Sequence, residues 1–187
     1  DIAETGIQAS GKPVTIRNCV IRSPRFQGII AKADSGFVYN CTFDRGLEGF
    51  QQYVDVGPSH TAKDWTVKNN IFYRQKRYFI WINSKNNITS DRNVFYASDY
   101  TKRWKKYTSE LSTLAAWQDS TGQDANSIVA DPLFVNETAG NYRIKPTSPA
   151  KNRGSDSVLS RSVTDFRGKL PNGLRDIGAY EYWRRNP

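Results

Sequence analysis

The chain has 187 residues, with 27 Lys and Arg against 18 Asp and Glu, and a formal net charge of +9. This length fits one domain that can bury a core without metal or disulfide staples. No apolar run approaches the roughly 18 residues of a membrane helix, so we expect no membrane partner. The positive charge favours a polyanionic partner such as an acidic polysaccharide, although a basic surface with no such partner is the alternative.

The first predicted elements are four short runs with apolar residues at every second position. They span residues 5–10, 28–33, 51–56 and 78–83. This period is typical of half-buried strands. The inward-facing residues are predicted to be Ile7, Ala9, Ile29, Ala31, Val54, Val56, Ile80 and Ile82. The outward-facing residues are predicted to be Gln8, Ile30, Lys32, Tyr53, Asp55, Trp81 and Asn83.

A second set of segments alternates with these runs: VTIRNCVI (14–21), GFVYNCTF (36–43), WTVKNNIF (65–72) and TSDRNVFY (89–96). Asn18, Asn40 and Asn69 align, and Asn93 follows closely. Asn tolerates the left-handed conformation of a sharp corner, and Asn side chains stacked one rung above another can hydrogen-bond along the axis of a solenoid. A constant unit with unequal spacers predicts an all-β, single-stranded parallel β-helix, a solenoid with loops of unequal length.

Cys19 and Cys41 fall at equivalent places in adjacent coils of this predicted solenoid. We expect them to stack about 4.8 Å apart, the spacing of neighbouring strands. Two packed thiols fit this arrangement better than a disulfide, because neighbouring parallel strands suit disulfide geometry poorly. A bond between them is left open.

The regular coils end near residue 96, and residues 97–126 are predicted to be an insertion. A short helix is expected near 108–121, with Thr108 or Ser109 as N-cap and Gly122 as terminator. Before it, TKRWKKY interleaves basic and aromatic residues. Trp104 and Tyr107 could offer ring faces to a sugar or polyanion, or pack against the solenoid under an exposed loop.

The repeats, with the tail motifs VADPLFVN, GNYRIKPTSPAKNRGS and TDFRGKLPNGLRDIGAYEY, resemble right-handed parallel β-helix proteins of the pectate-lyase-like superfamily. The tail is similar to the C-terminal end of secreted bacterial members. The resemblance implies one right-handed β-helix domain over 1–187, with terminal coils in 127–187. It also implies secretion or a periplasmic location, and missing N-terminal coils of a longer parent. We expect SIVADPLFV to form a return strand and NYRIKPTSPAKNRGS to continue along the last rung.

In lyases of this superfamily, the resemblance implies a cleft over the sheet formed by 28–33, 51–56 and 78–83. β-Elimination needs a cation to neutralise the uronate carboxylate, a base and an acid. Candidate catalytic residues are Lys32, Tyr53 and Arg77. Candidate substrate-binding residues are Asp55, Arg74, Lys76, Tyr78, Trp81, Asn83 and Trp104.

Other functions stay open. Hydrolysis by a glycoside hydrolase of the same fold would need a carboxyl pair from Asp44, Glu48 and Asp55. A non-catalytic glycan-binding or structural solenoid is a further alternative. Nucleic acid is not expected as a partner, because no nucleic-acid motif is present. No cofactor is expected, although calcium at Asp55 is conceivable.

Overall fold

The computed structural model describes residues 4–52, 62–83, 88–97, 103–157 and 163–183. Most of this chain forms three sheets. The first contains β1 (Ile7–Ala9), β4 (Gln27–Ala31), β7 (Glu48–Gln52), β10 (Tyr78–Ile82), β13 (Trp104–Lys106) and β14 (Ser109–Leu111). The second contains β2 (Val14–Arg17), β5 (Gly36–Tyr39), β8 (Trp65–Lys68) and β11 (Ile88–Asp91). The third contains β3 (Val20–Arg22), β6 (Thr42–Asp44), β9 (Ile71–Tyr73), β12 (Val94–Tyr96) and β15 (Ile128–Val129).

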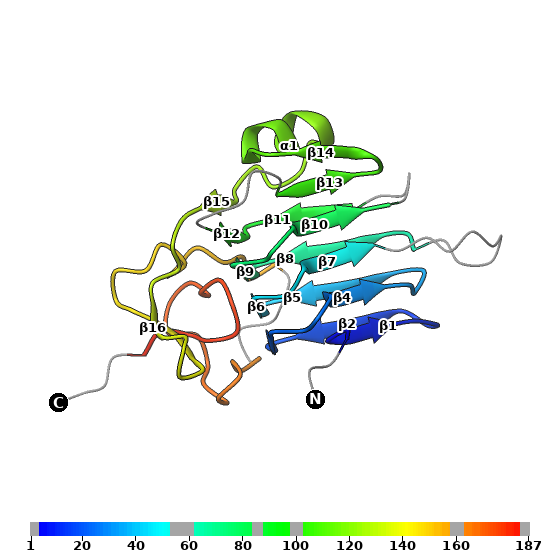
Figure 1. Cartoon of the computed structure of the whole chain (residues 1–187). Helices are drawn as coiled ribbons and strands as arrows, with labels where there is room; N and C mark the ends of the chain where they lie inside the picture. The colour runs from blue at the N-terminus through cyan, green and yellow to red at the C-terminus, as the bar shows by residue number, and fades with distance from the viewer. Residues whose placement is uncertain (1–3, 53–61, 84–87, 98–102, 158–162, 184–187) are drawn as a thin grey trace.

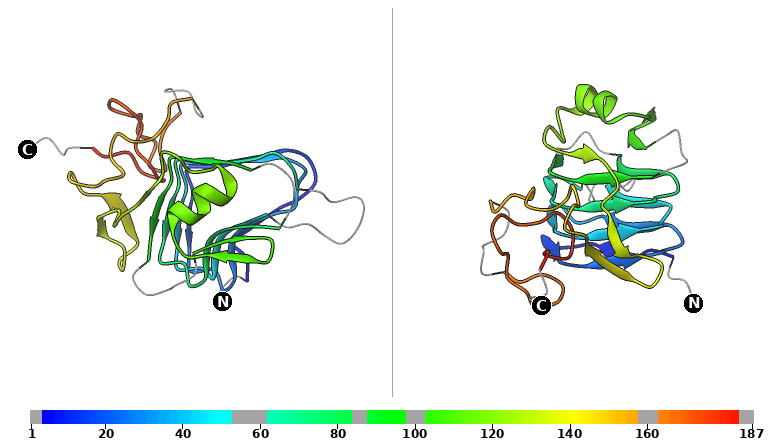
Figure 2. Two further views of the ribbon diagram at one scale, coloured as in Figure 1. Left: turned by 90° about the horizontal axis from the view of Figure 1, so that it is seen from above. Right: turned by 90° about the vertical axis from the view of Figure 1, so that its left-hand side faces the viewer.

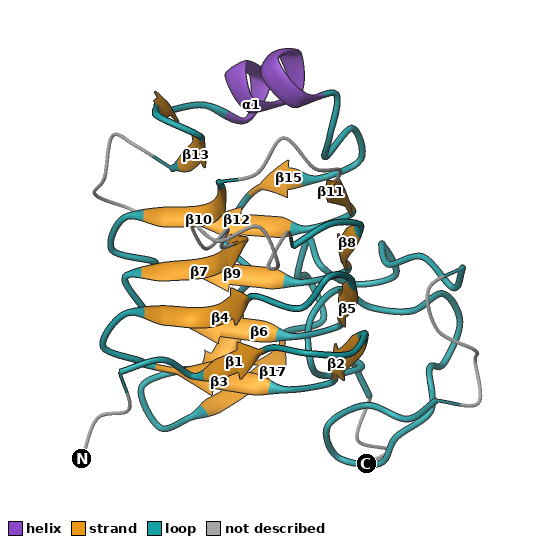
Figure 3. Ribbon diagram, turned by 90° about the vertical axis from the view of Figure 1, so that its right-hand side faces the viewer, coloured by secondary structure: helices purple, strands orange, loops and turns teal. Residues whose placement is uncertain are grey.

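The chain visits the first, second and third sheet in turn, and we call one such passage a coil. Every pairing between coils from β1 to β13 is parallel and in register. Successive coils therefore stack one above another (Figures 1 and 3). The expectation of a mostly β protein with parallel sheets and one short helix is confirmed.

Aromatic rings stack along the axis inside the coils. Phe43 and Phe72 lie nearly parallel with ring centroids 4.8 Å apart, and Phe72 and Phe95 follow at 5.4 Å. All three side chains are almost completely buried. Because removing a buried Phe ring typically costs roughly 3–5 kcal/mol, this stack is a main source of cohesion between coils.

The strand predicted over 51–56 starts earlier than expected, since β7 spans Glu48–Gln52; of the predicted residues, only 51 and 52 are described. Its Phe50 aligns with Ile29 and Ile80 on the core side. Gly49 permits this register, because a Cβ there would lie 2.3 Å from the Phe72 ring. Val54 and Val56, with Tyr53 and Asp55, lie outside the described residues.

The corners between the second and third sheets follow the Asn pattern in three coils. Asn18, Asn40 and Asn69 have φ values of 53°, 50° and 58°. In the fourth coil, Arg92 takes the left-handed corner at φ 53°, so Asn93 was aligned one residue too late. Asn93 instead aligns with Asn70, whose backbone N–H donates to Asn93 Oδ1 at 2.9 Å.

The two cysteines belong to the same ladder as Asn70 and Asn93. The Cys41 backbone N–H donates to Asn70 Oδ1 at 2.9 Å, and the Cys19 carbonyl accepts from the Thr42 N–H at 2.8 Å. Both cysteines are free thiols, Cys41 buried and Cys19 partly exposed. The packing interpretation of the pair therefore agrees with the structure.

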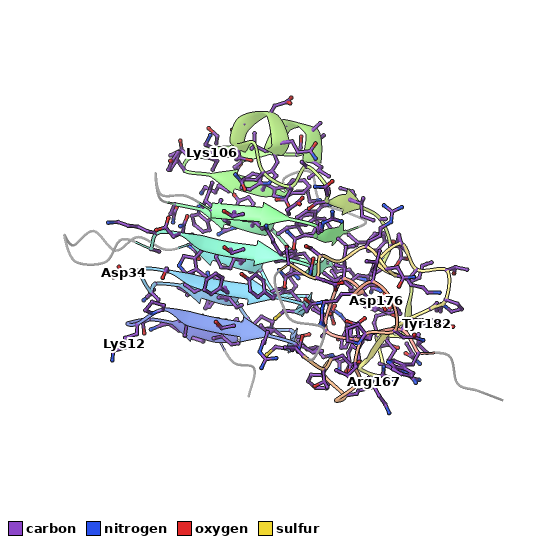
Figure 4. All side chains as sticks on the ribbon, turned by 180° about the vertical axis from the view of Figure 1, so that it is seen from behind. Lys12, Asp34, Lys106, Arg167, Asp176 and Tyr182 are labelled. Atoms are coloured by element: carbon purple, nitrogen blue, oxygen red, sulfur yellow. The ribbon has the colours of Figure 1, made fainter. Side chains whose placement is uncertain are left out.

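The insertion begins with a hairpin, in which β13 and β14 pair antiparallel. The helix α1 (Leu114–Thr121) starts later than predicted, with Thr113 as its N-cap, because 109–111 are used as a strand. Gly122, at φ 67°, ends the helix as expected. The hairpin and α1 lie over the last coil (Figure 1), with Lys106 beside the helix (Figure 4). Within the described ranges, no helix has the length and apolar character that crossing a membrane requires.

After β15, the chain runs back along the side of the coils (Figure 2). The strands β16 (Phe134–Asn136) and β17 (Asn141–Ile144) form their own antiparallel sheet. NYRIK therefore does not continue the last rung, contrary to the prediction. The C-terminal segment is tied to earlier coils instead: Asn40 Nδ2 donates to the Asp176 carbonyl at 2.9 Å.

Candidate functional site

The outer face of the first sheet carries a group of charged and aromatic side chains. We call it the outer-face cluster, and it consists of Glu48, Arg77, Tyr78, Trp81, Lys105 and Glu110. Strand register brings these residues together: Tyr78 aligns with Glu48, Trp81 with Lys105, and Lys105 with Glu110. Neighbouring strands lie about 4.8 Å apart, so side chains on the same face at these positions are within contact range.

A buried carboxylate anchors the cluster. Glu48 forms an ion pair with Arg77 and accepts a hydrogen bond from Gln27 Nε2 at 2.9 Å. Burial raises the pKa of Glu48, while Arg77 acts in the opposite direction. Arg77 is still 43% exposed, so its guanidinium is held by Glu48 and faces solvent on its other side.

Cations flank the Trp81 ring. Lys105 Nζ lies 4.2 Å from the ring centroid, and Arg77 Cζ lies 5.4 Å from it. Trp81 is only partly buried, and its indole N–H has no hydrogen-bond partner in the described part of the chain. Aromatic faces with adjacent cations suit a sugar ring that carries negative charge.

Tyr78 lies beneath this surface. Its side chain is buried, and its hydroxyl donates a hydrogen bond to Glu110. Burial, reinforced by Glu110, raises the pKa of Tyr78 to about 12. At neutral pH the phenol is therefore protonated, and it donates its proton in the hydrogen bond to Glu110. Tyr78 is thus suited to position its neighbours and not to accept a proton.

Two predicted residues lie at the opposite end of the first sheet. Lys32 directly follows β4 and Asn83 directly follows β10, whereas Arg77 directly precedes β10. From the strand register, Lys32 and Arg77 are separated by roughly 20 Å along the strand direction. The structure does not bring Lys32 and Arg77 to one sugar.

Arg74 points away from the outer-face cluster. It forms an ion pair with Glu137 at 2.5 Å and bonds the Tyr73 hydroxyl, on the side covered by the C-terminal segment. Lys76 is exposed at the corner before β10 and lines a different cavity, with Arg25 and Arg45. Neither residue joins Trp81.

Trp104 offers no ring to solvent, so its candidate role in substrate binding is not supported and the alternative, packing against the solenoid, agrees with the structure. It is 1% exposed, and its ring lies 5.2 Å from Phe79 and 5.1 Å from Phe95. The reason is that β13 continues the first sheet with Ile80 aligned to Trp104, a core position. Tyr53 and Asp55, the remaining candidates, lie outside the described residues.

Lys105 and Glu110 were not among the site residues predicted from the sequence. Lys105 was considered only as part of a basic loop, because the strand β13 was not recognised. The available signal was spacing: Trp104 lies 24 residues after Ile80, close to the 22 residues between Ile7 and Ile29.

The expected carboxyl pair of a hydrolase does not form between Asp44 and Glu48. Asp44 is buried on the third sheet, where it accepts a hydrogen bond from Tyr142 Oη at 2.5 Å and pairs with Arg45 at 3.0 Å. Glu48 lies on the first sheet. In the described ranges, no three His, Cys, Asp or Glu residues gather closely enough to hold a metal ion.

Comparisons with known proteins define the family. The chain belongs to the family described as the right-handed beta helix region, whose profile matches residues 1–110. The chain is also similar to the invasin IpaD of Shigella dysenteriae, with 28% identity over 105 residues, 52% of this chain and 32% of that protein. The invasin IpaD of Shigella flexneri is 30% identical over 108 residues, with the same shares. The matched part spans about a third of the length of these curated relatives.

Proposed function

We propose that the chain binds an acidic, uronate-containing polysaccharide along the outer face of the first sheet, as part of a secreted or periplasmic carbohydrate-active protein. The observation that carries this proposal is the partly exposed Trp81 ring with two cations close to its centroid, Lys105 at 4.2 Å and Arg77 at 5.4 Å. The ring supplies an apolar face for a sugar, and the two cations can pair with its carboxylate.

The direction of the site supports a polymer rather than a single sugar. Gln51, Trp81 and Lys105 align across three neighbouring strands, so polar and aromatic groups follow one another along the axis of the coils. The net charge of +9 would speed the approach of a polyanion. The resemblance to pectate-lyase-like proteins, and the additional N-terminal coils that it implies, belong to the same proposal.

Lyase chemistry is the second candidate. Arg77 could neutralise a uronate carboxylate and acidify the neighbouring proton, and the Lys105 amine lies on the same face to accept that proton. Tyr78 fits these roles less well because its hydroxyl proton is donated to Glu110. Lys32 fits less well because it lies far from Arg77 along the strand direction. The contacts of Trp81 support binding, whereas catalysis also requires that Lys105 act as a base.

The test is retention on immobilised polygalacturonate and alginate, with a neutral glucan as reference. Trp81→Ala and Lys105→Ala should each reduce retention several-fold, and added salt should weaken wild-type binding. Lys145→Ala, which changes an exposed lysine after β17 by the same charge, should leave retention unchanged. Equal losses in Lys105→Ala and Lys145→Ala, with no loss in the charge-neutral Trp81→Ala, would show that only net charge matters and would overturn the proposed site.

The same proteins decide the lyase question. Absorbance of the unsaturated uronate product should rise with wild type on an acidic polysaccharide and stay flat with Lys105→Ala. Retention without any absorbance change would exclude the lyase and leave the binding proposal intact.

A further inference from the structure

The corner loops between the third and first sheets border an open cavity of about 550 Å³, which we call the corner pocket. Three successive coils contribute to it. Its lining consists of Ser23, Pro24, Arg25, Arg45 and Lys76. The corner pocket shares no lining residue with the outer-face cluster.

Backbone hydrogen bonds between coils fix the residues that carry these side chains. The Ser23 N–H donates to the Asp44 carbonyl at 2.7 Å, the Arg45 N–H to the Tyr73 carbonyl at 3.0 Å, and the Lys76 N–H to the Gly46 carbonyl at 2.8 Å. Ser23 and Arg45 both hold left-handed conformations, with φ values of 49° and 61°. Such strained corners persist only where their surroundings fix them, which makes the backbone of the pocket rigid.

Glycine shapes the pocket at one point. A Cβ on Gly46 would lie 2.9 Å from Pro24 Cγ and 3.1 Å from Gln75 Oε1. Because Gly46 has no side chain, the loop before β7 can approach the loop before β4, which contains Pro24. The cavity lies between these two loops and the loop before β10, which carries Lys76.

The charge of the corner pocket is not balanced from within the described chain. Arg45 is compensated, because its Nε lies 3.0 Å from Asp44. Arg25 and Lys76 form no ion pair with any described residue. The Ser23 hydroxyl likewise makes no hydrogen bond to the part of the chain that the structure describes.

Two uncompensated cations and one free hydroxyl thus line one cavity with a fixed backbone. From these features, we infer that the corner pocket binds a sulfate or phosphate monoester group. Its donors come from three levels of the fold, which suits a tetrahedral group with oxygens in several directions. A planar carboxylate would be satisfied by one guanidinium held side by side.

The size of the cavity favours an ester over the free anion. A volume of about 550 Å³ lies in the range of pockets that hold small organic molecules. It leaves room for a sugar or alcohol beside the anionic group. This inference depends only on the corner pocket, and it holds whether or not the outer-face cluster binds a polysaccharide.

The test is titration calorimetry at constant ionic strength with glucose 6-sulfate, glucose 6-phosphate, inorganic sulfate, inorganic phosphate and acetate. We expect saturable binding of at least one ester, weaker binding of the inorganic anions, and acetate weaker still. Arg25→Ala and Lys76→Ala should each weaken ester binding at least fivefold. Lys63→Ala, at an exposed position outside the pocket, is the matched charge control.

Each result has a defined meaning. Stronger binding of the phosphate or of the sulfate ester identifies which monoester the pocket takes. Binding of inorganic anions as strong as that of the esters would overturn the ester assignment, and equal binding of acetate would overturn the tetrahedral one. If Lys63→Ala weakens ester binding as much as Arg25→Ala and Lys76→Ala do, the effect comes from net charge alone, and the corner pocket is not the binding site. Because both pocket residues are exposed, circular dichroism of the variants should match wild type, and retention on polygalacturonate reports separately on the outer-face cluster.

Discussion

Asn69 and Ser155 exchange two hydrogen bonds across 86 residues of sequence. Asn69 Nδ2 donates to the Ser155 carbonyl at 3.0 Å, and the Ser155 N–H donates to Asn69 Oδ1 at 2.9 Å. The same Asn forms the left-handed corner of its coil and bonds Asn40 Oδ1 at 3.3 Å. One side chain therefore shapes a coil and fastens the C-terminal segment to it.

Replacing Asn69 separates these two roles. Asn69→Gly keeps the left-handed corner and removes the bonds to Ser155, so we expect a loss of about 1–3 kcal/mol in the free energy of unfolding. Asn69→Ala should lose roughly 1–2 kcal/mol more, because Ala is strained at positive φ. Urea denaturation measures both. Equal stability of the two variants would contradict the role of the corner conformation.

The Glu48–Arg77 pair gives a second prediction. Arg77→Met leaves a buried carboxylate without its cation, and because Arg77 is 43% exposed we expect a moderate loss of about 1–2 kcal/mol. The double variant Arg77→Met, Glu48→Gln should recover most of that loss, since no charge is then buried.

The pH dependence of Arg77→Met has a defined sign. Burial already raises the pKa of Glu48, and losing Arg77 raises it further. A raised carboxyl pKa gives stability that is present at low pH and lost as pH rises through the folded value. The variant should therefore differ from wild type more at pH 8 than at pH 5. A constant difference in chemical denaturation would show that Glu48 does not carry the effect.

The residues that sequence reasoning located correctly are those with strict periodicity. Ile29, Ile80 and the Asn40 corner follow from alternation and repeat alignment, because a one-residue slip would turn a strand's apolar side chains outward. The start of β7 was missed because Glu48 and Gly49 are not apolar, although Phe72 fills the space that Gly49 leaves. The register of β7 is therefore set by the packing of Phe72 from the third sheet against Gly49.

The site was harder to predict than the fold. Arg74, Lys76 and Arg77 are close in sequence, yet the corner directs them to the C-terminal segment, the corner pocket and the outer-face cluster, respectively. The destination of Arg74 depends on Glu137, which is 63 residues away. Local spacing carries no information about such contacts.

The two thiols should differ in reactivity. The hydrogen bond from Cys41 lowers the pKa of Cys19 to about 6, whereas burial raises the pKa of Cys41. At pH 7, Cys19 is then mainly a thiolate, the reactive form. The alkylation rate of Cys19 with iodoacetamide, followed by peptide mass spectrometry, should reach half its maximum near pH 6. In Cys41→Ala the midpoint should move upward towards the ordinary value of 9.0; an unmoved midpoint would refute the coupling.

The C-terminal segment contains a buried carboxylate with a raised pKa. Glu181 bonds Arg175 at 3.2 Å and accepts from the Asp176 N–H at 3.0 Å, and its backbone carbonyl accepts from Arg167 Nη2 at 2.9 Å. Burial, with the charges of Asp176 and Asp165, raises its pKa to about 7 against the opposing effect of Arg175. The folded protein therefore holds a proton that the unfolded chain releases near 4.5.

This proton makes stability fall as pH rises. Between about pH 4.5 and 7 the folded state binds more protons than the unfolded state, so Glu181 should reduce the free energy of unfolding by about 1–3 kcal/mol across that window. Glu181→Gln, which cannot titrate, should lose this slope, while Glu4→Gln at an exposed position should keep it. Chemical denaturation at half-unit pH steps measures the difference. If Glu181→Gln follows the wild-type profile, the carboxylate is ionised throughout, and its pairing with Arg175 outweighs the cost of burial.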